Sequence, residues 1–292
     1  MLKPALLVVP LLLLAGCAAP APDDGLIHVV ASTSVYGDLA QQIGGSGVEV
    51  TSIIDDPAQD PHQFEANGRV QLALSRADVV IVNGGGYDDF ATTMLDASGN
   101  DGARIIDAVE LSGYDTGADD FNEHVWYDYP TMQTVVMAIA AALDIADPAH
   151  ATAYDGRADG LVAQLDALIQ FEGSIAAAAG GAGVIITEPV PLYALEAAGL
   201  RNLTPPEFSE AIEQDIDVPA TLLQSVLNRI GDGSAAVVVY NAQTGGPQTD
   251  AILDVASDNS VPAIGLTEIL PDDVGYVDWQ SGFLQELLRA LT

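Results

Sequence analysis

Two series of short apolar stretches constrain the fold of this chain more than any other feature of its sequence. Stretches rich in Val and Ile lie at 27–32, 48–54, 79–83 and 104–106, and again at 183–187, 236–240 and 262–266. Segments with helical periodicity lie between them at 36–43, 70–77, 220–230 and 249–256. Continuous apolar strands that alternate with helices are typical of parallel sheets covered on both faces. The pattern therefore predicts an α/β fold with two lobes.

The segment between the two series predicts one long helix. Apolar residues recur there at three- and four-residue steps: Tyr154, Ala158, Leu161, Leu165, Leu168 and Phe171. Gly180 and Gly181 then favour a helix end. We expect two Rossmann-like lobes with parallel sheets joined by this helix. The expected boundaries are 26–147 for the N-terminal lobe, 148–179 for the bridging helix and 180–292 for the C-terminal lobe.

The N-terminus resembles that of a secreted lipoprotein. Lys3 is followed by an apolar run from Ala5 to Leu14, which is shorter than the roughly 20 residues needed to span a bilayer. The next residues, Leu14-Ala15-Gly16-Cys17, resemble a bacterial lipobox, in which the cysteine is acylated and begins the mature chain. We expect a signal peptide over 1–16, lipidation at Cys17 and a tether over 17–25. The protein would then be extracytoplasmic and held at the cell membrane; a plain signal peptide with a chance cysteine is the alternative.

Composition excludes several classes of protein. The chain has 42 acidic and 8 basic residues and a formal net charge of −34, so it repels phosphate backbones and we expect no nucleic-acid partner. Its hydrophobic content of 49% is too high for a disordered acidic tail. A single cysteine excludes a disulfide scaffold.

Two histidine segments stand out in the first half. The first is Asp60-Pro61-His62-Gln63-Phe64-Glu65, which follows the second predicted strand at the sheet edge where α/β folds bind ligands. The second is Asn122-Glu123-His124-Val125-Trp126-Tyr127-Asp128-Tyr129-Pro130. Asp128 and Pro130 predict a helix start with the Asp128 carboxylate as its cap, and Trp126 is expected to stiffen the loop before it. Taken alone, either histidine could be a surface residue.

Together the two segments resemble those of the zinc- and manganese-binding lipoproteins that serve ABC transporters. That family has a loop like Asp-Pro-His-x-Phe-Glu followed by His-x-Trp-x-Asp-x-Pro, and each histidine is a metal ligand. The resemblance extends over essentially the whole chain, including the bridging helix and the lipobox. It implies that His62 and His124 bind the metal in a cleft between the lobes.

The resemblance also implies two ligands from the second half. The family carries a His or Glu after a strand of the C-terminal lobe, and Glu188 occupies that position in Ile186-Thr187-Glu188-Pro189. The fourth ligand is usually an Asp after the last strand, where this chain has Glu268 instead. That departure adds one methylene to the side chain. An alternative is that Glu268 points into solvent and Asp272 or Asp273 coordinates the ion.

The chemistry of this set fits a carrier. Two neutral imidazoles and two carboxylates balance a divalent cation, which avoids the cost of an unbalanced charge in a dry interior. Four protein ligands with no position kept for water are typical of a closed site rather than a catalytic one. We therefore expect a receptor, not an enzyme, that captures a divalent transition metal and delivers it to an ABC permease. A secreted zinc-dependent hydrolase with Glu188 or Glu268 as general base, and an interaction lipoprotein with a structural metal, are the alternatives.

The identity of the cargo stays open between zinc and manganese, with iron as a third candidate. Zinc binds nitrogen and oxygen ligands more tightly than manganese or iron does. Two carboxylates, together with the absence of a His-rich loop before His124, favour manganese modestly. We expect a monomer whose partners are the membrane permease and, through the lipid, the membrane.

Other patterns are rejected as sites. Gly84-Gly85-Gly86 lacks the spacing of a dinucleotide loop and precedes two aspartates that would repel phosphate. The acidic segment 115–123 does not match a calcium-binding loop. His28, in the first strand, and His150, before the long helix, are expected to be structural.

Overall fold

Two four-stranded parallel sheets with the same topology form the framework of the protein. The computed structural model describes residues 25–59, 61–64, 67–118 and 121–292, so the predicted signal peptide and the predicted lipidation site Cys17 lie outside the described residues. The strands are β1 (Ile27–Thr33), β2 (Val48–Ile54), β3 (Val79–Val82), β4 (Arg104–Asp107), β5 (Gly183–Ile186), β6 (Arg201–Asn202), β7 (Ala235–Asn241) and β8 (Ala263–Leu266). The strand orders are β2-β1-β3-β4 and β6-β5-β7-β8, and neighbouring strands are parallel in both sheets. The predicted α/β fold is confirmed.

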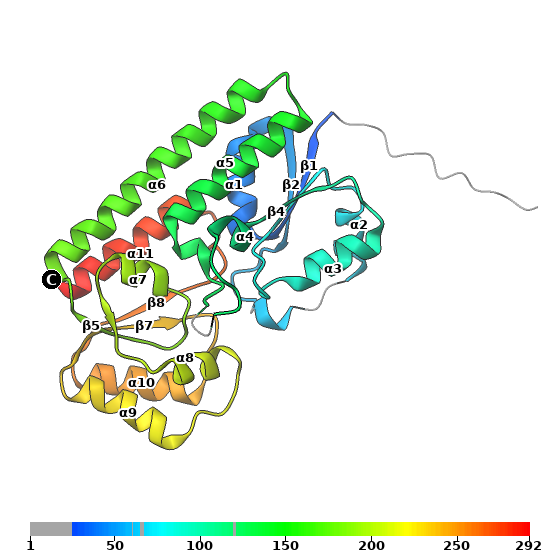
Figure 1. The fold of residues 1–292 in the computed structure, drawn as a ribbon. Coiled ribbons are helices and arrows are strands. Elements are labelled where there is room, and N and C mark those ends of the chain that lie inside the picture. Colours follow the sequence, from blue (N-terminus) through cyan, green and yellow to red (C-terminus); the bar gives the residue numbers. More distant parts are fainter. Residues whose placement is uncertain (1–24, 60, 65–66, 119–120) are drawn as a thin grey trace, which may run out of the picture.

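Helices cover both sheets, and in Figure 1 the N-terminal lobe runs from blue to green and the C-terminal lobe from yellow-green to red. Their bounds are α1 (Ser34–Gly44), α2 (Gly68–Leu74), α3 (Asp89–Ser98), α4 (Ala108–Ser112), α5 (Tyr129–Ala146), α6 (Ala151–Ala179), α7 (Leu192–Ala197), α8 (Pro206–Glu213), α9 (Ala220–Gly231), α10 (Pro247–Asp258) and α11 (Tyr276–Leu291). Short 3₁₀ turns lie at η1 (Gly45–Gly47), η2 (Pro61–Gln63) and η3 (Val125–Tyr127). The helix predicted over 70–77 ends earlier, at Leu74, because Ser75 and the residues after it turn toward β3.

The long helix α6 runs beside α5 and α11 and links the two sheets (Figure 1). Its buried face follows the predicted spacing from Tyr154 to Leu168. The next buried residues are Glu172 and Ile175, whereas Phe171 is half-buried, so the stripe shifts by one residue near the end. The helical glycines Gly156 and Gly160 face open space, where they leave the packing undisturbed.

One hydrophobic core is continuous through both lobes. It joins apolar residues of β1, α5, α6, β5, β7 and α11, while two smaller clusters lie beneath α2–α3 and beneath α8–α10. The core is continuous because α6 and α11 pack against elements of both lobes. Within the described residues α5 is long and apolar enough to cross a membrane, but 50% of that stretch is buried in the fold, as expected for a core helix.

Candidate metal site

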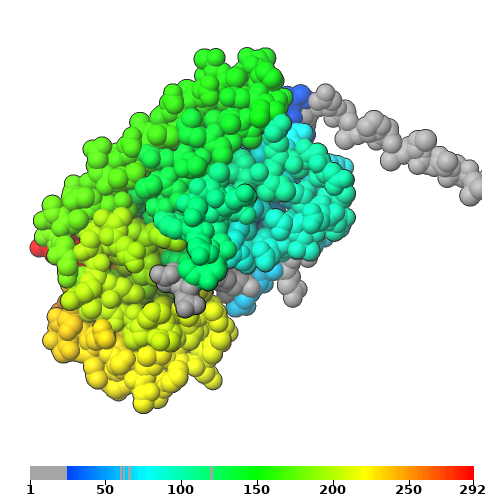
Figure 2. Space-filling view, viewed as in Figure 1, coloured from blue at the N-terminus to red at the C-terminus, as the bar shows by residue number. Residues whose placement is uncertain are grey.

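Three of the four predicted ligands lie after strands, and the fourth, His124, lies directly before η3. His62 lies in η2 after β2, Glu188 follows β5, and Glu268 follows β8. The side chain of His62 lies outside the part of the chain that the structure describes, as do residues 60, 65 and 66. Figure 2 shows the yellow C-terminal lobe in contact with green segments of the N-terminal half.

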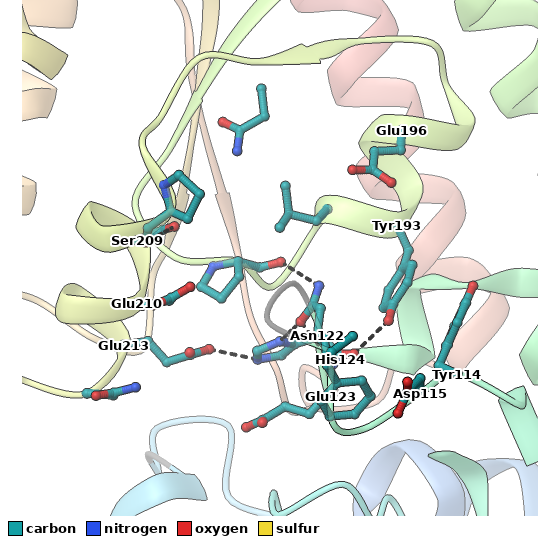
Figure 3. Close-up of a pocket in the computed structure, with 17 residues that line it drawn as sticks. Tyr114, Asp115, Asn122, Glu123, His124, Tyr193, Glu196, Ser209, Glu210 and Glu213 are labelled. Atoms are coloured by element: carbon teal, nitrogen blue, oxygen red, sulfur yellow. Dashed lines mark hydrogen bonds and ion pairs between the residues drawn. The ribbon is translucent and has the colours of Figure 1, made fainter. Parts of the chain in front are cut away.

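The orientation of the His124 ring is fixed by its neighbour Asn122. The imidazole is fully buried, and its Nδ1 lies 2.6 Å from the Asn122 side-chain oxygen, which can only accept a hydrogen bond. Nδ1 must therefore carry the proton, which leaves Nε2 as the coordinating atom of the neutral ring. Asn122 in turn donates to the Pro189 carbonyl across the lobe boundary, at 3.0 Å (Figure 3).

Aromatic packing holds the His124 loop, as predicted, but the helix cap differs. Trp126 is buried and its ring centroid lies 5.0 Å from that of His124 and 4.9 Å from that of Tyr87. Asp128 is the N-cap residue of α5, yet its carboxylate bonds no backbone amide of the helix. It accepts instead from the hydroxyls of Thr131 and Tyr114. The expectation of a capping carboxylate is wrong, because the carboxylate is directed at these two hydroxyls, which both donate to Oδ2.

The two glutamates meet at one amide group. Asn241, at the end of β7, donates from Nδ2 to Glu188 Oε2 at 2.6 Å and to Glu268 Oε1 at 2.8 Å. Thr244 donates to the other oxygen of Glu188, and Tyr87 donates to Glu268 Oε2 across the lobe boundary at 3.1 Å. Both glutamates are almost fully buried. The asparagine thus holds two carboxylates side by side.

Glu268 faces His124 rather than solvent. Its Oε2 lies 3.7 Å from His124 Nε2, and 1% of the residue is exposed. Asp272 and Asp273, which the sequence left as alternatives, are both exposed. The geometry therefore favours Glu268 over these two aspartates as the residue of this loop that faces the cleft.

A third glutamate reaches the same histidine and is absent from the sequence-based set. Glu213, the last residue of α8, places Oε1 3.2 Å from His124 Nε2 (Figure 3). The regular spacing of acids in α8 could have indicated this helix. In a chain with 42 acidic residues, however, an acidic helix face is usually one that is exposed to solvent. The surrounding cavity of about 730 Å³ is lined by Tyr114, Asp115, Ala118, Phe121, Asn122, Glu123, His124, Pro189, Leu192, Tyr193, Glu196, Asn202, Pro206, Ser209, Glu210, Glu213 and Gln214.

Burial and mutual charge perturb the pKa values of these groups. Burial raises the pKa of Glu188 to about 7, although hydrogen bonds from Thr244 and Asn241 oppose the shift. Burial raises the pKa of Glu213 to about 8. For His124 burial acts downward, but the neighbouring carboxylates of Glu268 and Glu213 prevail, and its pKa rises to about 8. The site therefore binds protons tightly at neutral pH.

Across the described ranges, no group of three or more His, Cys, Asp or Glu side chains could hold an ion as it stands. The closest approach is a cluster of one imidazole and glutamates that share hydrogen bonds with Asn241 and Tyr87. These are nitrogen and oxygen donors of the kind that zinc and manganese accept. The arrangement can bind a divalent cation once the carboxylates turn from their hydrogen bonds toward a common point.

The rejected patterns have other roles. The amides of Asn83 and Gly84 donate to the Asp88 carboxylate at 2.6 and 2.8 Å, so this loop holds an internal acid in the place where a dinucleotide loop would hold phosphate. His28 pairs with Glu49 at 3.2 Å, and His150 pairs with Asp147 at 2.6 Å.

Comparison with known proteins decides the family. The model of the family described as "Zinc-uptake complex component A periplasmic" (ZnuA) matches residues 29–290. The chain belongs to this family. It is accordingly a substrate-binding protein of the metal ABC transporter type and not an enzyme, as the sequence predicts.

Relatives and solved structures agree with this assignment. The manganese-binding lipoprotein MntA of Halalkalibacterium halodurans is 25% identical over 278 residues, which cover 87% of each chain. MntA of Bacillus subtilis is 31% identical over 148 residues, 48% of each chain. The chain matches about half the length of that protein and of a relative from Treponema pallidum, 48% and 50% respectively.

The fold resembles that of the periplasmic zinc-binding protein TroA from Treponema pallidum. The TM-score is 0.76 at 17% identity, covering 92% of this chain and 100% of the other. The crystal structure of ZnuA has a TM-score of 0.75 at 18% identity and covers 91% and 100%. Both likenesses confirm two parallel-sheet lobes with a long helix.

Proposed function

We propose that this protein is a lipid-anchored extracytoplasmic receptor that captures a divalent transition metal and delivers it to an ABC permease for import. The ligands would be His62, His124, Glu188 and Glu268, and the lipid would be attached at Cys17. The lobes would comprise residues 26–147 and 180–292, with 148–179 as the bridge. The names of relatives as manganese-binding and iron ABC transporter lipoproteins support metal as the cargo.

One observation carries the proposal. Glu188 and Glu268, both buried, are joined through Asn241 after two strands of one sheet, and Glu268 lies 3.7 Å from Nε2 of the buried His124 of the other lobe. Buried carboxylates cost free energy unless they are paired with charge, and the described part of the site offers no Lys or Arg. A divalent cation supplies that missing positive charge.

The test is a metal titration of the protein without its signal peptide. Chelated protein should stay folded, because its core is continuous without the ion, and should bind one zinc or manganese ion per chain with a rise in melting temperature. His124→Ala and His62→Ala should lose binding, whereas His150→Ala, an exposed histidine paired with Asp147, serves as the matched control. Zero or two bound ions in calorimetry would contradict the one-site proposal.

Variants of Glu268 test the ligand that departs from the family pattern. Glu268→Gln keeps the size of the side chain but removes half of the anionic charge, so affinity should fall at least about tenfold, or 1.4 kcal/mol. Glu268→Asp should be milder, because it keeps the charge and restores the usual residue. Unchanged affinity in Glu268→Gln would remove this residue from the ligand set.

The physiological cargo is a separate question from affinity. We expect zinc to bind more tightly than manganese in vitro, whichever ion is carried. We infer manganese over zinc from the two carboxylate ligands. The metal content of cells that lack the protein, grown under depletion of zinc, manganese or iron in turn, distinguishes them.

A further inference from the structure

The imidazole of His124 faces a second buried atom that also lacks a hydrogen-bond partner. His124 Nε2 and Glu213 Oε1 are 3.2 Å apart, both are shielded from water, and neither makes a hydrogen bond of acceptable geometry within the described residues. Buried polar atoms of this kind cost free energy unless a proton or a cation satisfies them. At 3.2 Å no group fits between the two atoms, so a cation that satisfies both would lie beside them.

The surroundings of Glu213 offer no positive side chain to complete it. The residues that line the cavity include Glu123, Glu196 and Glu210 but no Lys or Arg (Figure 3). Glu213 itself is 12% exposed, whereas Glu210, one turn earlier in α8, is exposed. Of these two acids, Glu213 is the one whose carboxylate reaches His124, at 3.2 Å. A cation is the chemical group that would satisfy the inward carboxylate and the imidazole together.

We propose that Glu213 is an additional ligand of the transported ion, contributed by α8 to the His124 side of the site. This inference rests on the function proposed above and extends its ligand set. With His62, His124, Glu188 and Glu268 the set would hold three carboxylates. The bound site would then carry a net charge of −1 and offer at least five donors.

A set of this kind favours some divalent ions over others. Zinc in closed protein sites is almost always four-coordinate and tetrahedral. Manganese suits carboxylate-rich sites, and such hard-ligand sites are commonly six-coordinate. Glu213 is thus a specificity-determining residue, because a third carboxylate stabilises the ion with the larger coordination number more than it stabilises zinc.

The experiment compares Glu213→Gln with Glu207→Gln in manganese and zinc titrations. Glutamine keeps the size of the side chain and removes its charge, and within the described residues Glu213 Oε1 makes no hydrogen bond whose loss would disturb the fold. We expect manganese affinity to fall by about tenfold or more in Glu213→Gln and zinc affinity to fall less. Glu207 is an exposed acid in the first turn of α8 and does not line the cavity. Glu207→Gln should therefore leave both affinities unchanged, which controls for the general effect of removing one acid from α8.

Spectroscopy of the bound ion adds a readout that a distant charge would not change. Cobalt(II) absorbs weakly with five or six ligands and strongly in tetrahedral sites, so Glu213→Gln should intensify the visible bands of the cobalt form. X-ray absorption of the manganese-loaded unmodified protein counts the ligands without any variant. Five or more nitrogen and oxygen neighbours with three carboxylates are expected.

Several results would overturn the assignment. Tighter binding of both ions by Glu213→Gln would show that the carboxylate competes with the metal for His124. Equal losses in Glu213→Gln and Glu207→Gln would show that Glu213 acts only through its general negative charge. Unchanged affinities in Glu213→Gln would show that it has no role in binding. In all three cases the unmodified protein still binds one ion, so the proposed function survives; only an unmodified protein that binds none would refute both.

Discussion

One glutamine side chain ties together the two loops that would carry ligands from opposite lobes. The Nε2 group of Gln243 donates to the carbonyls of Pro57 at 2.9 Å and Gln59 at 3.1 Å, in the segment that leads from β2 to the first predicted histidine. Its oxygen accepts from the amides of Glu268 and Ile269. All the hydrogen-bonding capacity of the amide is thus used to hold both loops before an ion arrives.

Replacing Gln243 with alanine should therefore weaken metal binding without unfolding the protein. A net hydrogen bond contributes about 0.5–1.5 kcal/mol, and two of the bonds cross the cleft, which gives about 1–3 kcal/mol. Gln243 is half-buried, so water can replace part of this, and we take about 1–2 kcal/mol. The ion would then have to order the loop itself, and the dissociation constant should rise about 5- to 30-fold.

The assay is a zinc titration in competition with a chelator, with thermal unfolding of the metal-free protein measured in parallel. Gln224→Ala is the matched control, because that glutamine lies on α9 and bonds only within its own helix, to Asn228 at 3.0 Å. A fall in melting temperature with unchanged affinity would show that Gln243 supports the fold alone. That result would refute the argument that it preorganises the site.

Three further predictions concern protons and backbone. Metal binding requires an ionised Glu188 and a neutral His124, whose pKa values are raised to about 7 and about 8. Metal affinity should therefore fall steeply from pH 8 to pH 6, and calorimetry should detect proton release on binding. An affinity that does not change over this pH range would contradict the prediction. Burial and the charge of a nearby aspartate raise the pKa of Glu172 from 4.5 to about 8. The folded chain therefore holds a proton that the unfolded chain releases, and this contribution to stability is full below about pH 4.5 and lost as the pH rises through about 8. Denaturant unfolding should find Glu172→Gln more stable than the unmodified protein at pH 8.5 and nearly equal at pH 4.5; equal stability at both would contradict the shift. Gly160→Ala, in open space on α6, should raise the free energy of unfolding by about 0.5–1 kcal/mol. Gly84→Ala should lower it by more than about 1 kcal/mol, because φ is +80° and the new Cβ would lie 2.2 Å from a carboxylate oxygen; the reverse order of melting temperatures would contradict both.

The sheets could be predicted from sequence because their strands are buried on both faces. Such strands are unbroken apolar runs, and β2 has the predicted bounds of Val48–Ile54. The strand β6 escapes prediction because it is an edge strand of two residues, Arg201 and Asn202, neither of them apolar. The helix α8 escapes because Pro205 and a series of acids resemble a solvated loop, although Phe208 packs into the core of the C-terminal lobe.

The site divides in the same way. Glu188 and Glu268 could be singled out only through the resemblance to the family, which has a ligand after a strand of the C-terminal lobe and another after the last strand; both side chains are buried. Asn241 and Gln243 could not, because an amide carries no charge or periodic pattern that distinguishes a structural bridge from a surface residue. Glu213 could not either, since only the packing of α8 distinguishes it from the exposed Glu210.

The continuous core limits how an ion can enter and leave. Separating the lobes would break the packing of α11 against α6, α1, β7 and β8, and it would also break the bond from the Tyr276 hydroxyl to the Trp126 carbonyl at 2.6 Å. Burying apolar area of this kind contributes roughly 25 cal/mol per Å², so wide opening is costly. We therefore expect exchange of the ion to proceed while α6 and α11 stay in place. Gln243→Ala and Glu213→Gln, which change side chains at the site and leave the packing of these two helices intact, should then change the rate of release without changing the fold.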